Sequence, residues 1–210
     1  MSIPSIIFDL GNVLLFFDQG KALRALAQHL NPLTAMLLWA RKDEFLKDLR
    51  AEADLLESGR ISLEQFYSRL KGKIGLTIDF DGFQRIWNDI FSPNEPVLAL
   101  AQQLSTRYDC YVFSNTNASH FEFVKSSFPV LNFAKGWSVS HELGAMKPAR
   151  EFYDQALAQH SLQAADCVFI DDLEANVHGA RTAGLDAIHY RSPHQLVTDL
   201  AARGITPPSI

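Results

Sequence analysis

The sequence has few cysteines, no long apolar run and no excess of basic residues. Cys110 and Cys167 are its two cysteines among 210 residues, and each begins a short apolar run. Buried reduced thiols are therefore expected rather than a disulfide framework. No apolar run approaches the ~20 residues that a membrane-spanning helix needs. The formal net charge is −5, which argues against a nucleic-acid partner because such partners select a basic face.

The N-terminal segment MSIPSIIFDL has neither the basic stretch nor the long apolar stretch of a secretory signal peptide. We therefore expect a cytoplasmic protein that binds no membrane, as a monomer or a weak homodimer. The sequence also lacks internal repeats, low-complexity tracts and Gly/Ser-rich linkers. At 210 residues it is long for one compact domain and short for two, so a core domain with an inserted subdomain fits best.

Short runs of β-forming residues predict the strands of the core domain. Four are strong and a fifth is weaker: SIIF before Asp9, CYVF (110–113), CVFI (167–170), AIHY (187–190) and, more weakly, WSVS (137–140). Continuous apolar runs of this length suit strands that are covered on both faces, as in a parallel sheet. Helical patterns at 118–128, 149–160 and 174–184 alternate with them. This alternation predicts the α/β class with a doubly wound parallel sheet.

Residues 18 to about 92 break the alternation with consecutive helical patterns. Ser62 and Gln65 form a predicted capping box at the start of one helix, and the charged run 41–54 predicts a solvent-exposed helix face with i,i+4 ion pairs. FSPNEP (91–96) is interpreted as a turn before the next helix. We expect an inserted helical-bundle cap at 17–92 and an α/β core made of 1–16 and 93–210. The cap would lie above the carboxyl ends of the strands, where open α/β sheets bind ligands.

Polar residues follow the predicted strands at their carboxyl ends. Asp9 follows the first, Ser114-Asn115 the second and Asp171-Asp172 the third, and Lys147 lies in a loop just before Pro148. A single aspartate after a strand is more often a turn former than a catalytic residue. Together, however, these residues occupy the edge at which a doubly wound sheet gathers its active site.

These residue types suit phosphoryl transfer. An aspartate such as Asp9 can attack phosphorus and form an aspartyl-phosphate that water later hydrolyses. The carboxylates of Asp9 and Asp172 suit Mg²⁺, a hard cation that prefers oxygen ligands. Ser114 and Lys147 can hold the remaining oxygens of a charged phosphoryl group.

This order of motifs resembles the haloacid dehalogenase (HAD) superfamily. Its members have a first strand ending in D-x-D-x-T/V, a second ending in Ser or Thr, a loop lysine and a third strand ending in an acidic pair. The counterparts here are FDLGNV, VFSNTN, AMKP and VFIDDLEAN, and they span the whole chain. The insert is similar to the cap of subfamily IA, and LESGRISLEQFY with IWNDIF is similar to bacterial members that act on sugar phosphates, including alpha-D-glucose-1-phosphate phosphatases. The resemblance implies a Rossmann-like core with a helical cap and Mg²⁺-dependent hydrolysis of a small phosphorylated metabolite.

The resemblance also implies roles for individual residues. Asp9 becomes the nucleophile, and Ser114 and Lys147 bind the phosphate. Asp172 becomes a side-chain ligand of Mg²⁺, and Gly11 would offer its carbonyl oxygen to the metal.

Three further acidic or amide residues would have less direct roles. Asp171 would influence the metal site without contacting the ion, or would bind the ion through a water molecule. Asn176 lies where many relatives carry another acidic residue. Asn115 would shape the phosphate-binding loop and contact the substrate.

Gly11 departs from the family pattern. Relatives often have an aspartate at this position, which protonates the leaving oxygen and then activates water. Without it, the enzyme would favour leaving groups that depart unaided, such as those of sugar 1-phosphates, acyl phosphates or aryl phosphates, or would recruit another proton donor. His120, one helical turn from the phosphate-binding loop, is the candidate donor and a candidate substrate contact.

Other functions stay open on the sequence alone. A 2-haloacid dehalogenase would use the same aspartate nucleophile, but such enzymes work without metal and carry neutral residues in place of Asp171-Asp172. A phosphomutase would normally need an acid–base residue at position 11. A catalytically weak regulatory protein of the same fold is the remaining alternative, since one acidic residue is missing.

Overall fold

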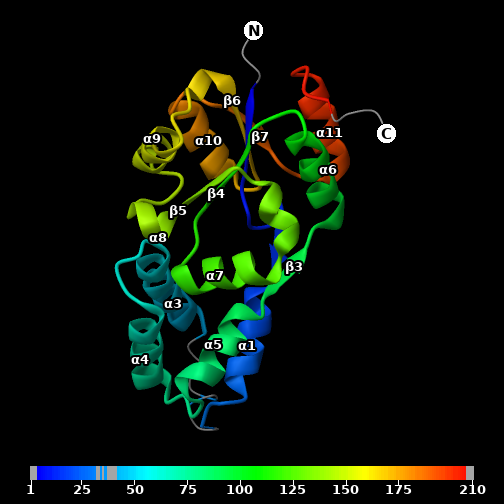
Figure 1. The fold of residues 1–210 in the computed structure, drawn as a ribbon. Helices are drawn as coiled ribbons and strands as arrows, with labels where there is room; N and C mark the ends of the chain where they lie inside the picture. The colour runs from blue at the N-terminus through cyan, green and yellow to red at the C-terminus, as the bar shows by residue number, and fades with distance from the viewer. Residues whose placement is uncertain (1–3, 32–33, 35, 37–41, 207–210) are drawn as a thin grey trace.

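A five-stranded parallel sheet forms the upper part of the molecule in Figure 1. The computed structural model describes residues 4–31, 34, 36 and 42–206. The strand order is β5-β4-β1-β6-β7, with β1 (Ser5–Phe8), β4 (Cys110–Ser114), β5 (Gly136–Val139), β6 (Cys167–Asp171) and β7 (Asp186–His189). The sheet thus grows outwards in both directions from the central β1. The prediction of a doubly wound α/β sheet is confirmed.

Helices cover both faces of this sheet, because successive strand residues point to opposite sides. Ile6 and Phe8 pack into a cluster with α6 (Glu95–Ser105) and α11 (Pro193–Ala201), whereas Ile7 packs into a cluster with α9 (Arg150–Gln159) and α10 (Glu174–Thr182). The remaining elements of this part are α7 (Ala118–Ser127) and the shorter η1 (Pro129–Phe133), α8 (Ser140–Leu143) and η2 (Ala164–Asp166). Cys110 and Cys167 are buried and free, as expected.

Within the described residues, four further helices lie below the carboxyl ends of the strands (Figure 1). They are α1 (Gln19–Ala27), α3 (Lys42–Glu57), α4 (Leu63–Ile74) and α5 (Phe80–Asn88). Their apolar faces form a separate cluster around Phe66 and Phe83. The Ser62–Gln65 capping box at the start of α4 is present in the structure. We refer to these helices as the cap, and the boundaries proposed for it from the sequence remain a prediction.

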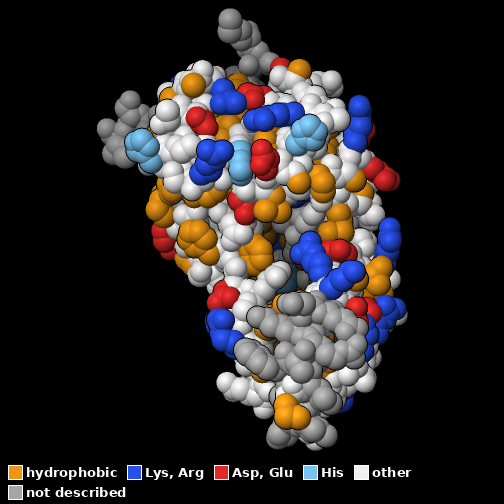
Figure 2. All heavy atoms as spheres, turned by 180° about the vertical axis from the view of Figure 1, so that it is seen from behind, with side chains coloured by type: hydrophobic (Ala, Val, Ile, Leu, Met, Phe, Trp, Pro, Cys, Tyr) orange, Lys and Arg blue, Asp and Glu red, His pale blue; other side chains and the backbone are white. Residues whose placement is uncertain are grey.

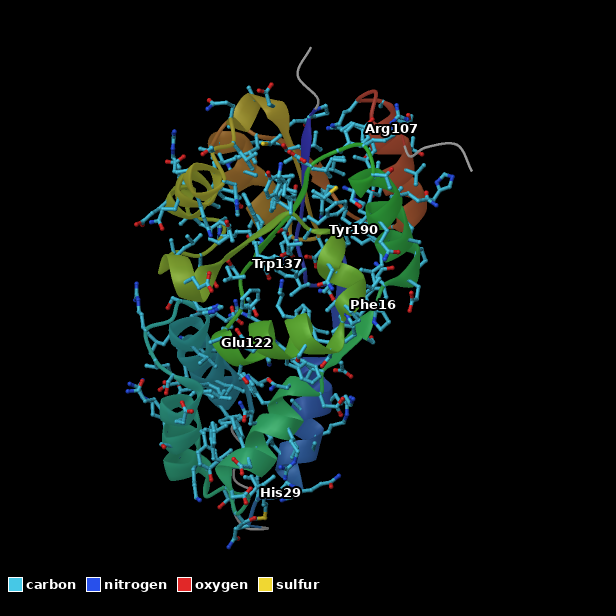
Figure 3. The ribbon with its side chains drawn as sticks, in the orientation of Figure 1. Phe16, His29, Arg107, Glu122, Trp137 and Tyr190 are labelled. Carbon is cyan, nitrogen blue, oxygen red and sulfur yellow. The ribbon has the colours of Figure 1, made fainter. Side chains whose placement is uncertain are left out.

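A two-stranded antiparallel ribbon, β2 (Leu15–Phe17) with β3 (Phe91–Pro93), connects the cap to the core. The interpretation of 91–96 as a turn was therefore wrong for its first three residues. Strands of three residues are too short to show an alternating pattern in the sequence. After the end of β3, Asn94 donates hydrogen bonds to the carbonyl oxygen of Val13 (2.8 Å) and to the hydroxyl of Tyr190 (3.0 Å). Tyr190 is labelled in Figure 3. The Asn94 side chain fixes the connection instead of capping α6.

None of the helices among the described residues is both long and apolar enough to cross a membrane.

Candidate active site

The carboxyl ends of the central strands bring the predicted residues together. Phe8 of β1 pairs with Val112 of β4 and with Ile170 of β6. The residues that follow in the chain therefore emerge side by side, which places Asp9 between the end of β4 and Asp171. The register of a parallel sheet, rather than proximity in sequence, assembles this group.

Lys147 lies at the centre of the group. Its ammonium donates hydrogen bonds to Asp9 Oδ1 (2.6 Å), to Asp171 Oδ2 (2.7 Å) and to the carbonyl oxygen of Phe113 (3.0 Å). The side chain is only 1% exposed. All three ammonium protons are therefore used, and the cation is held between two carboxylates that would otherwise repel each other.

Burial and neighbouring charges shift the pKa values of these groups. Burial raises the pKa of Asp9 to about 7, although the attraction of Lys147 opposes the rise. Burial also raises the pKa of Asp172, against the hydrogen bond from Asn12. For Lys147, burial would lower the pKa, but the carboxylates of Asp171 and Asp9 outweigh it and the pKa is raised. The site thus carries more negative charge than Lys147 alone compensates.

The two aspartates at the end of β6 have different surroundings. Asp171 is fully buried, and its oxygens accept from Lys147, from the backbone N–H of Leu173 (2.9 Å) and from Asn176 Nδ2 (3.0 and 3.1 Å). Asp172 is partly buried and lines the cavity with Asp9 and Gly11. One carboxylate oxygen from each of Asp9, Asp171 and Asp172 lies within 4.8 Å of the other two. This cluster could hold a metal ion, with Asp9 and Asp172 on the open side.

Ser114 and Asn115 lie beside this cluster at the end of β4. The Ser114 hydroxyl has a long contact of 3.4 Å to the carbonyl oxygen of Asn115, so it is available to a ligand in the cavity. The amide of Asn115 is engaged on both sides: Nδ2 donates to Lys147 O (2.9 Å) and Oδ1 accepts from Lys147 N (2.8 Å). Asn115 lines the cavity, but its side chain already positions the loop that carries Lys147.

The ring of Phe17 occupies the space beside Gly11 that a side chain at position 11 would need. A Cβ atom built at position 11 would stand 2.9 Å from Cε1 of Phe17, on β2. Gly11 is not among the glycines of positive φ, so its backbone accepts other residues. The obstacle to a side chain here is a movable, exposed ring.

His120 lines the cavity, as predicted for a substrate contact. However, both of its ring nitrogens are engaged. Nε2 lies 2.9 Å from the carbonyl oxygen of Trp87 and must carry the proton, so Nδ1 accepts from Asn117 Nδ2 at 3.0 Å. Burial lowers the pKa of His120 to about 4. A neutral imidazole with its N–H already used is a poor proton donor, and this argues against the donor role suggested from the sequence.

Two adjoining cavities extend from this group into the cap. The first, of about 160 Å³, is lined by the site residues described above except Asp171, and the second, of about 110 Å³, lies between α1, α3 and α5. They share Gln19, Arg50, Glu57, Ile90 and His120, and the second is otherwise lined by apolar residues such as Leu23, Leu49 and Trp87. Figure 2 shows a hollow at mid-height on the rear face, with Lys and Arg side chains beside it.

Arg50 and Glu57 were missed by the sequence analysis. The run 41–54 predicted an exposed face, and Arg50 does pair with Asp54 at i,i+4 (3.0 Å), yet Arg50 also lines both cavities. Glu57, the last residue of α3, is partly buried there. Helical spacing alone does not show which charged residues of a cap helix face the core.

Comparison with known proteins agrees with this geometry. A family model described as HAD-hydrolase-like matches residues 145–209. The chain is 25% identical to D-ribitol-5-phosphate phosphatase of Bacteroides thetaiotaomicron over 193 residues, which cover 88% of this chain and 90% of the relative.

Solved structures share the fold. A HAD family enzyme from Bacteroides thetaiotaomicron superposes with a TM-score of 0.78 and 22% identity, covering 91% of this chain and 95% of that one. The wild-type structure of a Bacteroides thetaiotaomicron HAD enzyme in complex with magnesium and inorganic phosphate gives a TM-score of 0.76 at 22% identity, with coverage of 90% and 95%. The fold, the matching family model and the four motifs around Lys147 show that the chain belongs to the haloacid dehalogenase-like superfamily of hydrolases.

Proposed function

We propose that this chain is a magnesium-dependent phosphatase that hydrolyses a phosphate monoester of a small metabolite through an aspartyl-phosphate on Asp9. The observation that carries the proposal is the position of the Asp9 carboxylate. It lies at the end of the central strand, is held by Lys147, and faces a cavity that also contains Ser114 and Asp172. The aligned relative acts on a phosphorylated sugar alcohol, which supports the same reaction class.

The acidic cluster fits a magnesium ion. Its donors are carboxylate oxygens, which hard divalent cations prefer. Burial and, to a smaller extent, neighbouring carboxylates raise the pKa values of Asp9 and Asp172. A bound cation would therefore reduce the repulsion between these carboxylates. Asp9, Asp172 and the carbonyl oxygen of Gly11 would hold the ion, and Asp171 would support it through Lys147. When bound, the ion supplies positive charge to the phosphate oxygens.

The residues of this chain divide the reaction between them. A carboxylate oxygen of Asp9 attacks phosphorus, the bond to the leaving oxygen breaks, and water later hydrolyses the acyl phosphate. Ser114 Oγ donates to a phosphate oxygen, and Lys147, whose protons are held by Asp9, Asp171 and the carbonyl of Phe113, stabilises the phosphate through its positive charge. The hydrogen bonds between Asn115 and the backbone of Lys147 keep this lysine in place before substrate arrives.

A haloacid dehalogenase would require a different distribution of charged side chains around the cavity. Its substrate carries a carboxylate next to the reacting carbon, and Asp172 lines the cavity where that carboxylate would lie. Two aspartates around one anion repel it unless a cation is present. Asp171-Asp172 therefore favours phosphate-ester chemistry over dehalogenation.

The substrate class follows from the leaving group. Because Gly11 has no side chain to donate a proton, leaving groups that are weak bases should depart fastest unless another residue of the cavity supplies the proton. Sugar 1-phosphates, acyl phosphates and aryl phosphates have such leaving groups. The part of the substrate beyond the phosphate would extend into the second cavity, whose apolar lining includes Leu23, Leu49 and Trp87. Aryl phosphates satisfy both conditions.

The test is hydrolysis of p-nitrophenyl phosphate with Mg²⁺ or with EDTA, beside chloride release from 2-chloropropionate. Phosphatase activity that depends on Mg²⁺ is expected, and an Asp9→Asn variant should fold, bind phosphate and lose turnover because an amide is not a nucleophile. Wild-type rates in Asp9→Asn would exclude the covalent mechanism. Chloride release without phosphate release would favour the dehalogenase.

A further inference from the structure

The cavity lacks a proton donor at the position where relatives place one, because residue 11 is glycine. The ionisable side chains that line the cavity in the described part of the chain are Asp9, Arg50, Glu57, His120, Lys147 and Asp172. Three of these six side chains already have another role or no available proton. Asp9 is the nucleophile, Lys147 uses its protons on three acceptors, and His120 has both nitrogens engaged.

Of the remaining groups, Asp172 accepts a hydrogen bond from Asn12 Nδ2 (3.1 Å) and belongs to the metal cluster. Arg50 is a permanent cation and does not exchange protons near neutral pH. Glu57 is different. Within the part of the chain that the structure describes, its carboxylate makes no hydrogen bond or close ion pair.

The backbone of Glu57 is fixed against the phosphate-binding loop. Its carbonyl oxygen accepts a hydrogen bond from Ser140 Oγ, and the same Oγ accepts one from the backbone N–H of Thr116 (2.9 Å), two residues after Ser114. Close by, Gly59 lies so near α8 that a Cβ there would stand 2.3 Å from the carbonyl oxygen of His141. The end of α3 is therefore held in contact with the core, and Glu57 lines both cavities from the cap side.

The environment of Glu57 suits proton exchange at neutral pH. Burial raises its pKa to about 7, Arg50 opposes this rise, and Asp54 adds to it. The other charged or titratable residues that line the same cavity are Asp9, His120, Lys147 and Asp172, and α8, which α3 contacts, carries His141 and Glu142. A group whose pKa lies near the working pH can both donate and accept a proton in one catalytic cycle.

We propose that Glu57 is the acid–base residue of this site, acting from the cap in place of the side chain that position 11 lacks. In the first half-reaction, a carboxylate oxygen of Asp9 forms a bond to phosphorus. The bond between phosphorus and the leaving oxygen breaks, and that oxygen takes the proton of Glu57. In the second, the Glu57 carboxylate removes a proton from water, the water oxygen bonds to phosphorus, and the bond to Asp9 breaks. The proposal rests on the phosphatase function proposed above.

The proposal predicts a dependence on the leaving group. Benzyl phosphate releases a strongly basic alkoxide unless it is protonated, whereas p-nitrophenyl phosphate releases a stable anion. Both carry an aromatic ring that suits the apolar second cavity. In a Glu57→Gln variant, kcat/KM for benzyl phosphate should fall by about 10²–10⁴-fold, the usual contribution of general acid–base catalysis. The first half-reaction with p-nitrophenyl phosphate should change less than about tenfold, since it gains little from general acid catalysis.

The second half-reaction gives an independent signature. Because Glu57→Gln cannot activate water, the phosphoenzyme should accumulate with p-nitrophenyl phosphate. A rapid-mixing experiment should then show a burst of about one p-nitrophenolate per active site, followed by a slow steady rate. In the wild type, the acid-catalysed step with benzyl phosphate should decline as the pH rises above about 7, and the variant should lose this decline.

The matched control is Glu52→Gln. Glu52 lies on the same helix, but its carboxylate pairs with Arg69 (3.0 Å) and does not line either cavity. Glu52→Gln should match the wild type on both substrates.

Wild-type kinetics of Glu57→Gln on benzyl phosphate would overturn the proposal, as would an equal loss on both substrates without a burst, which indicates a structural role. Failure of the wild type to hydrolyse either ester would instead overturn the phosphatase function.

Discussion

Removing the charge of Lys147 tests the central ion-pair cluster. Lys147→Met keeps most of the side-chain volume but leaves Asp9 and Asp171 facing each other without their shared cation. Loss of one partner from a buried pair typically costs about 3–5 kcal/mol, because the remaining charge is buried and unpaired. For a protein of this size, each kcal/mol shifts the midpoint of thermal unfolding by about 2–4 °C. The expected loss is therefore about 6–20 °C.

Lys135→Met provides the matched control. Lys135 pairs with Asp109 at 2.7 Å, the distance of the Lys147–Asp171 pair, but its side chain is 59% exposed while that of Lys147 is 1% exposed. Exposed pairs contribute about 0–1 kcal/mol, so this variant should shift the midpoint by less than about 4 °C.

The measurement is thermal unfolding at pH 7 in EDTA, followed by circular dichroism. A second variant, Lys147→Met with Asp171→Asn, removes one of the two unpaired charges and should recover part of the loss. Equal shifts for the two single variants would refute the argument that burial gives the Lys147 cluster its energy.

The remaining predictions concern metal binding and the leaving group. Asp172→Asn should sharply raise the Mg²⁺ concentration that gives half-maximal hydrolysis of p-nitrophenyl phosphate, because one charged ligand is lost. Asp171→Asn should mainly lower thermal stability. If Asp171→Asn instead raised the Mg²⁺ requirement more than Asp172→Asn, the direct metal contact would belong to Asp171. In Glu57→Gln, which lacks the proposed acid, a hexose 1-phosphate should be hydrolysed faster than the matching 6-phosphate, and adding Gly11→Asp should narrow this gap as the Phe17 ring turns aside. Equal rates of Glu57→Gln on the two phosphates in a coupled phosphate-release assay would contradict the leaving-group argument.

The core of this fold could be predicted from sequence because its strands are buried on both faces. Continuous apolar runs such as SIIF and CVFI have no other stable placement in a chain of this composition. Each run ends abruptly in a polar residue, and parallel pairing then brings Asp9 and Asp171 together without further information. The site residues of the core follow from the same pattern that gives the sheet.

The residues of the cap could not be predicted in this way. Arg50 and Glu57 lie on a helix whose charged residues recur at helical spacing, and that pattern alone is typical of a solvated surface. Their position in the cavity depends on how α3 packs against α8, a contact between elements far apart in sequence. β2 and β3 were missed for a different reason, since three-residue strands carry too little pattern.

A proton donor on the cap makes catalysis depend on the contact between α3 and α8. An acid–base residue at position 11 would be present in the site whether or not the cap touches the core, because it follows β1 directly. Glu57 reaches the cavity only while the end of α3 rests on α8, where the Ser140–Glu57 hydrogen bond and the close approach of Gly59 to His141 hold it. The same contact that buries Glu57 also raises its pKa towards neutrality. This contact would then both supply the proton and tune the donor, so a variant that weakens it would leave the core able to bind phosphate but poorly able to expel a basic leaving group.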